Sequence, residues 1–275
     1  MRIDGDTMIV FGGVYGNAHA LEALQKAEPD VKTSAMVCAG DLAAYCADGS
    51  KVCGLMRREF SQATIIRGNC ERTLSADDGD CGCGYASGSA CETLSVAWYA
   101  HARADISDND KTWMGSLPSR ATLEFGGRVL AAFHADIDSD NRFIFASTPA
   151  EDKQRSILAL GADGVITGHS GIPFTDNIDG KLWHNSGALG MPANDGTPRV
   201  WYSRWTAKEE GIYIEHCALD YDVSAAQASM IRAGLPDEYR LALETGIWPS
   251  DDILPPAERA QQGSRLSPET CFWPR

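Results

Sequence analysis

The chain has 275 residues, and its 24 lysine and arginine residues against 38 aspartate and glutamate residues give a formal net charge of −14. Hydrophobic residues make up 44% of the sequence, a globular balance that argues against wholesale disorder. The acidity argues against non-specific binding to nucleic acid or to an anionic membrane, because both attract clustered positive charge. No apolar run approaches the ~20 residues of a membrane-spanning helix.

Nine cysteines are the unusual feature of the composition, and seven of them lie between positions 38 and 91. The N-terminus lacks the basic start and the apolar run of a signal peptide. Without such a signal, reduced thiols are the default interpretation, and an odd number of cysteines cannot pair completely. We therefore expect a cytoplasmic protein whose crowded cysteines have either a packing reason or a chemical one.

Short apolar runs that predict strands recur along the chain, and most of them end in a polar, glycine-containing loop. Helical patterns follow several of these loops, which is the strand–loop–helix rhythm of an α/β sheet. The predicted strands span 8–11, 35–38, 63–67, 122–125, 128–133, 164–167, 181–183, 198–204 and 211–219. The predicted helices span 18–27, 52–60, 224–234 and 237–243.

Four residues of metal-ligand type come directly after predicted strands: Asp41, Asn69, His134 and His169. In an α/β sheet, ligands bind at the carboxyl ends of the strands, so these four side chains are expected to point into one cleft. One carboxylate, one amide oxygen and two imidazoles form a plausible metal site. A single such residue would be weak evidence, but four at successive strand ends favour a functional site over unrelated loop residues.

These loops resemble the motifs of the calcineurin-like metallophosphoesterase superfamily, in particular its small bacterial phosphodiesterase-like branch. The similarity covers about residues 8–202, with the motifs in the correct order. The matching segments are Gly13–Asn17, Gly40–Asp41, Gly68–Glu71, His134, Gly168–Gly171 and Asn185–Ala188.

The resemblance implies a four-layer α-β-β-α sandwich of two mixed β-sheets flanked by helices. We expect the phosphoesterase domain to span residues 1–222. Residues 223–275 are expected to form a helical and proline-rich extension that packs on the same domain. The prolines after residue 246 discourage regular structure there.

The resemblance also implies two metal ions that share Asp41. The second ion would take Asn69, His134 and His169 as well, and all of these ligands are present. The first ion would take the residues at positions 13, 15 and 171, which are glycine, tyrosine and glycine here. Because glycine has no side chain to ligate, the losses fall on one of the two metal sites.

Other residues could rebuild the missing site. Tyr15 could ligate ferric iron as a tyrosinate, or it could be a packed or substrate-stacking ring. His184 could supply an imidazole. Cysteines 81, 83 and 91 could form a metal site or a redox pair, although their spacing differs from the paired C-x2-C of a zinc ribbon, and ordinary reduced thiols remain the commoner outcome.

The candidate catalytic residues are His134, Cys70 and Arg142. Cys70 stands where many relatives carry a catalytic histidine, but a thiol with a pKa of about 8.5 is a poor acid at neutral pH. Arg142 could hold phosphate through its guanidinium, although surface ion pairing is the more common role. The polar loop over 74–89 is long enough to act as a lid.

The sequence therefore predicts a metal-dependent hydrolase of phosphate mono- or diesters with a small phosphorylated substrate. The ligand set suits a divalent or trivalent transition metal (Mn, Fe or Zn), with one ion implied and a second dependent on replacement ligands. The first alternative is a catalytically impaired relative that binds a phosphorylated ligand or a partner protein. A redox or metal-sensing protein is a third hypothesis. The sequence does not determine whether the chain forms a homo-oligomer.

Overall fold

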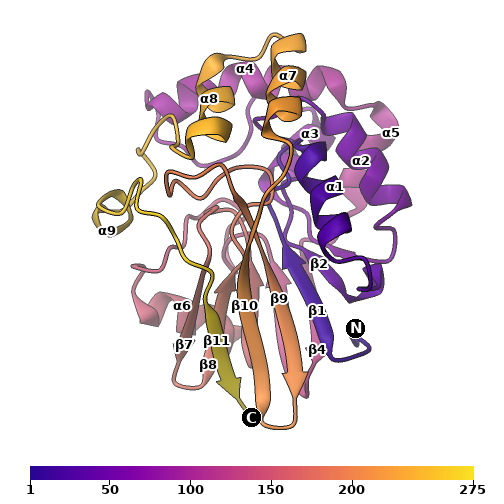
Figure 1. Ribbon diagram of the computed structural model, residues 1–275, viewed down its shortest axis with the longest axis vertical. Helices are drawn as coiled ribbons and strands as arrows, with labels where there is room; N and C mark the ends of the chain where they lie inside the picture. The colour runs from indigo at the N-terminus through magenta and orange to yellow at the C-terminus, as the bar shows by residue number, and fades with distance from the viewer.

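The structure is a computed structural model that describes all residues, 1–275. Eleven strands form two β-sheets that face each other at the centre of the molecule (Figure 1). The strands are β1 Thr7–Phe11, β2 Met36–Cys38, β3 Thr64–Ile65, β4 Arg120–Phe125, β5 Arg128–Phe133, β6 Gly164–Thr167, β7 Phe174–Ile178, β8 Lys181–Asn185, β9 Val200–Lys208, β10 Gly211–Leu219 and β11 Thr270–Pro274.

Each sheet mixes parallel and antiparallel pairs. The first sheet has six strands in the order β11-β10-β9-β1-β2-β3, and the parallel pairs join β1, β2 and β3. The second sheet has five strands in the order β4-β5-β6-β8-β7, and the parallel pairs join β5, β6 and β8. The carboxyl ends of the parallel strands therefore form the edge at which loops can bring side chains together.

The helices form the outer layers and a cap. They are α1 Ala18–Ala27, α2 Gly49–Arg58, α3 Asn69–Ala76, α4 Ala90–Asp105, α5 Asp108–Ser116, α6 Ala150–Ala159, α7 Val223–Arg232, α8 Asp237–Thr245 and α9 Pro256–Arg259, with a short 3₁₀ turn at Thr33–Ala35. None of them is both long and apolar enough to cross a bilayer. Side-chain oxygens of Asn17, Ser89, Ser107 and Asp222 cap the first turns of α1, α4, α5 and α7.

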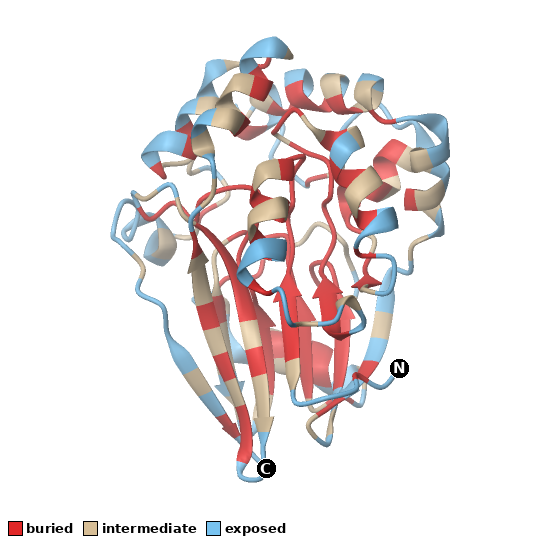
Figure 2. Ribbon diagram, turned by 45° about the vertical axis from the view of Figure 1, so that its right-hand side comes forward, coloured by how far each residue is buried: buried red, intermediate tan, exposed pale blue.

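Strand β1 shows why the sandwich has four layers. Met8 and Val10 point into the core between the two sheets, whereas Ile9 and Phe11 point outward against α1 and α2. Because both faces of the strand are buried, its sequence is a continuous apolar run rather than an alternating one. Figure 2 shows the central strands as largely buried and the outward faces of the helices as exposed.

On the other side of the sandwich, α6 covers the second sheet, where Ile157 packs with Val165 and Trp183. The order of layers is thus helices, first sheet, second sheet, helix. This arrangement confirms the α-β-β-α sandwich of two mixed sheets that the sequence predicts.

Helices α4, α7 and α8 lie above the sandwich in Figure 1, over the ends of the strands. They share a buried cluster to which α4 contributes Trp98, α7 contributes Met230, and α8 contributes Tyr239 and Leu243. Tyr15, from the loop after β1, belongs to the same cluster. The helical cap therefore packs directly on the loops that follow the parallel strands.

All the predicted strands and helices are present, with small shifts at their ends. The 122–133 hairpin and the late antiparallel pair, β9 with β10, form as predicted. The sequence analysis missed α3, α4, α5, α6, α9, β7 and β11, and for the helices one reason is that much of what they bury is small or polar. The buried residues of α6, for example, are Lys153, Ser156 and Ile157, which give only a weak apolar periodicity.

The proline-rich end of the chain is more regular than expected, because its last segment forms β11. This strand lies at the edge of the first sheet and pairs with β10 from Thr270 to Pro274. An edge position tolerates Pro274, since a proline there removes no hydrogen bond from a central ladder. Trp273 points into the core between the sheets, and its Nε1–H donates to the Gly180 carbonyl at 2.9 Å.

Trp273→Ala is expected to lower the free energy of unfolding by about 3–5 kcal/mol, because it leaves a cavity between the two sheets. Phe272→Ala is the matched control, since the neighbouring ring in the same strand is 42% exposed. Urea unfolding followed by tryptophan fluorescence and circular dichroism measures both changes. Equal losses for the two variants would contradict the placement of Trp273 in the core.

Candidate metal centre

Four ligand atoms converge on the carboxyl ends of the parallel strands. The Nε2 atom of His134 lies 3.1 Å from Asn69 Oδ1, 3.2 Å from His169 Nδ1 and 3.2 Å from Asp41 Oδ2. All four residues are buried. The structure thus brings together the four residues that the sequence analysis selected. The ligand atoms of Asp41, His134 and His169 all lie within 4.8 Å of one another, close enough to hold one metal ion.

The loops that carry these residues turn sharply after each strand. Asp41 follows β2 and His169 follows β6, and both residues have a φ of 58°, in the left-handed region. Such backbone strain in non-glycine residues concentrates at functional sites. At Gly40, a Cβ atom would lie 2.7 Å from the Gly68 nitrogen and 2.9 Å from His134 Nδ1, so only glycine allows the two loops to approach this closely.

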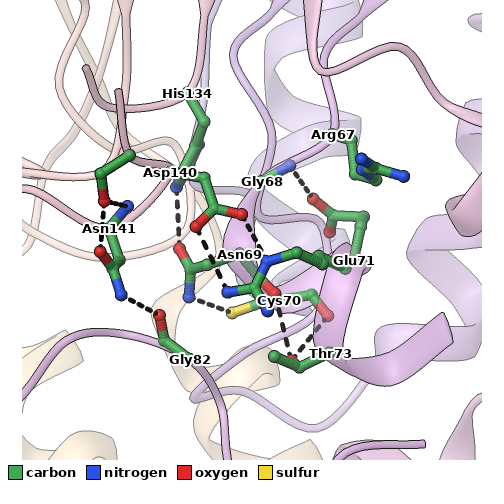
Figure 3. Close-up of polar contacts among 12 residues, drawn as sticks. Arg67, Gly68, Asn69, Cys70, Glu71, Thr73, Gly82, His134, Asp140 and Asn141 are labelled. Carbon is green, nitrogen blue, oxygen red and sulfur yellow. Dashed lines mark hydrogen bonds and ion pairs between the residues drawn. The ribbon is translucent and has the colours of Figure 1, made fainter. Parts of the chain in front are cut away.

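Neighbouring groups orient the ligand atoms toward one another. His134 donates Nδ1–H to the Ala39 carbonyl at 2.6 Å, which directs Nε2 toward the centre. Asn69 donates from Nδ2 to the Cys81 carbonyl at 2.9 Å and to Cys83 Sγ at 3.3 Å, so its Oδ1 also faces the centre. Figure 3 shows His134 above Asn69, with the amide nitrogen of Asn69 directed toward the sulfur of Cys70.

Glu71 connects the loops after β2 and β3 without reaching the centre itself. Its Oε2 accepts the backbone N–H of Asp41 and of Gly68, both at 2.8 Å, and its Oε1 accepts the N–H of Leu42 at 2.7 Å. Burial and the nearby Asp41 charge raise the pKa of Glu71 to about 7, although these hydrogen bonds oppose the shift. The sequence analysis quoted Glu71 within a motif but did not assign it a role.

The electrostatics of the centre are dominated by Asp41 and His134. Burial lowers the pKa of His134, but the charge of Asp41 and the hydrogen bond to it outweigh that effect and raise the pKa to about 9. Burial raises the pKa of Asp41, and His134 reverses this so that the net shift is downward. Burial and then His134 lower the pKa of His169 to about 4, which keeps the ring neutral at pH 7.

The donor set fits a transition metal. His134 Nε2 lies 3.1–3.2 Å from Asn69 Oδ1 and from the Asp41 carboxylate, and a metal cation would replace the proton that the raised pKa places on Nε2. With His169 Nδ1 directed inward, the proton of that ring sits on Nε2, which is buried and has no hydrogen-bond partner. Two nitrogen and two oxygen donors suit Mn, Fe or Zn.

Aromatic rings face the positions at which the resemblance expects ligands for a first ion. A Cβ atom at Gly13 would lie 2.6 Å from Cζ of Tyr15, and one at Gly171 would lie 3.4 Å from Cζ2 of Trp248. The Tyr15 ring also packs edge-on against Tyr45, with ring centroids 4.8 Å apart. Burial and the charge of Asp41 raise the pKa of Tyr15 well above its usual value, which favours the neutral phenol over the tyrosinate when no ion is bound.

His184 does not join the centre, which corrects the expectation that it could supply an imidazole. It lies in β8, fully buried, and both of its ring nitrogens are engaged at 2.8 Å, Nδ1 with Thr175 Oγ1 and Nε2 with Ser203 Oγ. Its ring also stacks on His216, with centroids 5.0 Å apart. The residue is thus a hydrogen-bonded core histidine.

Arg142 likewise stays outside the centre. Its guanidinium pairs with Asp136 at 2.8 Å and with Asp152 at 2.7 Å. It is not among the residues that line the pocket above the ligands. The structure therefore shows Arg142 in two salt bridges, and its phosphate contact stays a prediction.

Cys70 lies next to the centre, but it is buried and outside the pocket. Its Sγ accepts from Asn69 Nδ2 at 3.6 Å. A hydrogen bond with Cys83 lowers its pKa, but burial and Asp41 shift the pKa well above the usual value of a thiol. All nine cysteines are free thiols. Because a thiolate is the reactive form, burial makes Cys70 a poor acid–base or redox group.

A pocket opens above Asp41 and His169. The aromatic side chains that line it come from distant parts of the chain: Tyr15, Tyr45, Tyr85, Phe143, Tyr239 and Trp248. Tyr85 belongs to the 74–89 loop, which was expected to act as a lid, and Cys81 and Cys83 in the same loop are buried. The sequence analysis recognised only Tyr15 as a cleft residue, because the other rings carry no motif and meet only in three dimensions.

Known proteins share this architecture. A family model for the calcineurin-like phosphoesterase superfamily domain matches residues 9–207. No curated protein matches the chain significantly. A metallophosphoesterase from Sphaerobacter thermophilus has a TM-score of 0.69 at 18% identity, with 89% of this chain and 100% of that chain covered.

A hypothetical protein from Pyrococcus horikoshii OT3 has a TM-score of 0.73 at 14% identity, with 90% of this chain and 100% of that chain covered. At such identities, the two solved structures share the fold with this protein. The family model extends over most of the chain and over all the ligand positions. The chain therefore belongs to the calcineurin-like phosphoesterase superfamily.

Proposed function

We propose that this protein is a hydrolase of phosphate mono- or diesters that works with a single transition-metal ion held by Asp41, Asn69, His134 and His169. The observation that supports this proposal is the convergence of their ligand atoms within 3.2 Å of His134 Nε2. A buried carboxylate and buried imidazoles at such distances need a cation or a shared proton between them. Membership of the superfamily favours the cation.

A bound ion would supply a Lewis acid for a phosphate oxygen and lower the pKa of a bound water. The protein supplies the geometry. Ala39 holds the His134 ring through Nδ1, and the backbone and sulfur partners of Asn69 hold its amide. Glu71 ties the backbone of Asp41 to that of Gly68, so the ligands on two loops move as one unit.

Cys70 is buried with a raised pKa, and Arg142 is paired with two aspartates, so we assign neither of them to leaving-group protonation or to phosphate binding. The negative charge of the substrate would therefore rest on the metal ion. The rings of Tyr15 and Trp248, which face the positions of the lost ligands, support one ion in place of two.

The same rings also favour a second candidate, a catalytically impaired relative that binds a phosphorylated ligand or a partner protein. Without a first ion, no hydroxide bridges two metals, and much of the usual transition-state stabilisation for hydrolysis is missing. Turnover of a broad panel of phosphate esters by protein loaded with Mn, Fe, Zn, Ni or Mg separates the two candidates. Thermal shifts on ligand addition without any turnover would favour the second.

His169→Ala is expected to remove the bound ion and to abolish phosphate ester turnover. The loss should exceed the ~10- to 100-fold reduction in metal affinity or activity that follows the loss of an outer partner of a ligand. Elemental analysis of the purified protein and hydrolysis of an aryl phosphate and an aryl phosphodiester measure the two effects. His19→Ala in α1 is the control, since its side chain lies outside the pocket and the ligand set. Full metal content in His169→Ala would contradict the ligand assignment.

Glu71→Gln is expected to weaken metal binding by ~10- to 100-fold while the ligands themselves are unchanged. The amide nitrogen that replaces one oxygen would meet a backbone N–H where the carboxylate accepts one. Metal titration followed by calorimetry measures the change. Glu22→Gln, at a partly exposed pair with Lys51, controls for the loss of a negative charge. Unchanged affinity in Glu71→Gln would show that the loops hold their positions without it.

Gly13→Ala is expected to destabilise the protein by about 1–3 kcal/mol, through left-handed strain and through overlap with the Tyr15 ring. In a Tyr15→Ala background the overlap disappears, so a double-mutant cycle by urea unfolding should give a coupling of about 0.5–3 kcal/mol. Gly127→Ala isolates the strain, because its φ is also positive and no atom lies near the added Cβ. Additive effects at Gly13 and Tyr15 would mean that the ring does not fill this space.

A further inference from the structure

The pocket above the metal centre has an unusual lining for a site that would bind phosphate. Asp41 and His169 form its floor, so the pocket is continuous with the ligand set. The six aromatic rings, from Tyr15 to Trp248, form most of its walls, together with aliphatic residues such as Met191 and Ile253. A ligand bound to the ion would extend directly between these rings.

Charge on the pocket walls argues against a second anionic group. The lining residues include no lysine and no arginine, and Asp41 is the one carboxylate among them. A polyphosphate chain or a carboxylate in this space would lose its hydration without gaining a positive partner. The lining therefore favours an uncharged group beyond a metal-bound phosphate.

The rings are held in place before any ligand binds. Trp248 donates Nε1–H to the Pro192 carbonyl at 2.6 Å, and Phe143 stacks on His169 with centroids 4.3 Å apart. Tyr45 contacts Tyr239, with centroids 4.7 Å apart, and shares a hydroxyl hydrogen bond of 2.6 Å with Tyr85. Such preorganisation reduces the entropy cost of stacking a flat group between the rings.

One wall of the pocket is tied to the helical cap. Asp252 accepts the backbone N–H of Ala90 at 2.8 Å, at the start of α4, and so holds the segment that carries Trp248, Ser250 and Ile253 against that helix. The free volume inside is about 60 Å³. A space this small favours a small group over a bulky or branched one.

We propose that the pocket binds an uncharged, planar aromatic group of the substrate, so that the enzyme prefers phosphate esters of aromatic alcohols to those of aliphatic or anionic compounds. This inference rests on the proposed function, because the phosphate is held by the ion. Stacking on the rings supplies affinity, and the free hydrogen of the Tyr45–Tyr85 hydroxyl pair offers one polar contact.

The test compares benzyl phosphate with cyclohexylmethyl phosphate on the metal-loaded full chain. Both leaving groups are primary alcohols with the same number of carbon atoms, so they differ mainly in flatness and aromatic character. We expect kcat/KM to be at least tenfold higher for benzyl phosphate, and pyrophosphate to be a poor substrate. The ratio of kcat/KM for benzyl phosphate to that for cyclohexylmethyl phosphate should fall toward one in Tyr85→Leu. It should stay unchanged in Leu158→Ala, at an exposed position of α6.

Binding of the non-hydrolysable benzylphosphonate and cyclohexylmethylphosphonate, measured by calorimetry, makes the test independent of turnover. A tenfold tighter binding of benzylphosphonate without any hydrolysis would uphold the aromatic pocket and overturn the proposed hydrolase. Turnover of both esters with equal kcat/KM and equal phosphonate affinities would uphold the hydrolase and overturn the aromatic pocket. No binding and no turnover with any of these compounds would overturn both.

Discussion

The carboxylate of Glu71 is the constraint on which the rest of the centre depends. It is fully buried and accepts three backbone N–H groups, two from the loop after β2 and one from the loop after β3. Burying a carboxylate without a positive partner is costly, and several hydrogen bonds from backbone N–H groups offset that cost. As a result, the backbones that carry Asp41 and Asn69 are held together before any metal binds.

His134 plays the corresponding part between the two sheets. It leaves β5 in the second sheet, while its Nδ1–H binds the carbonyl of Ala39, which follows β2 in the first sheet. Glycine at positions 40 and 68 allows this close approach, since a Cβ atom at either would lie within 3.0 Å of the His134 ring. The metal centre is thus also a point where the two sheets of the sandwich are joined.

The lost metal ligands and the aromatic pocket are two aspects of one change. Glycine at positions 13 and 171 removes side chains that would occupy the space of Tyr15 and Trp248. The rings that fill it extend into the cluster formed by α4, α7 and α8, which covers the centre. An acidic protein whose pocket walls lack lysine and arginine can attract phosphate chiefly through a bound cation. The same walls then select what is attached to the phosphate.

The cysteine-rich segment also acquires a physical explanation. Cys81 and Cys83 are buried beside Asn69, where one backbone carbonyl and one sulfur accept hydrogen bonds from its amide. Sulfur is a weak acceptor that packs well among apolar side chains, so these thiols can orient a ligand inside an apolar cluster. The pKa of Cys81 is raised first by its hydrogen bond with Cys83 and then by burial, and the pKa of Cys83 is raised first by burial and then by Cys70, which agrees with a packing role.

The sequence by itself determined the strand–loop–helix pattern of an α/β fold and the four candidate ligands, because both depend on local patterns. The two-sheet sandwich, in contrast, was implied by the resemblance of the motifs to those of the superfamily. Apolar runs such as Met8–Phe11 form strands wherever both faces are buried, and Asp41, Asn69, His134 and His169 each follow such a run. The sequence did not reveal that His184 is hydrogen-bonded in the core, that Arg142 is paired with Asp136, or that six rings line one pocket. Only the tertiary structure decided these points, since they depend on which residues, far apart in the chain, lie next to each other. Hydrogen bonding, ion pairing and ring stacking act only at contact distance, and spacing along the sequence does not record that distance.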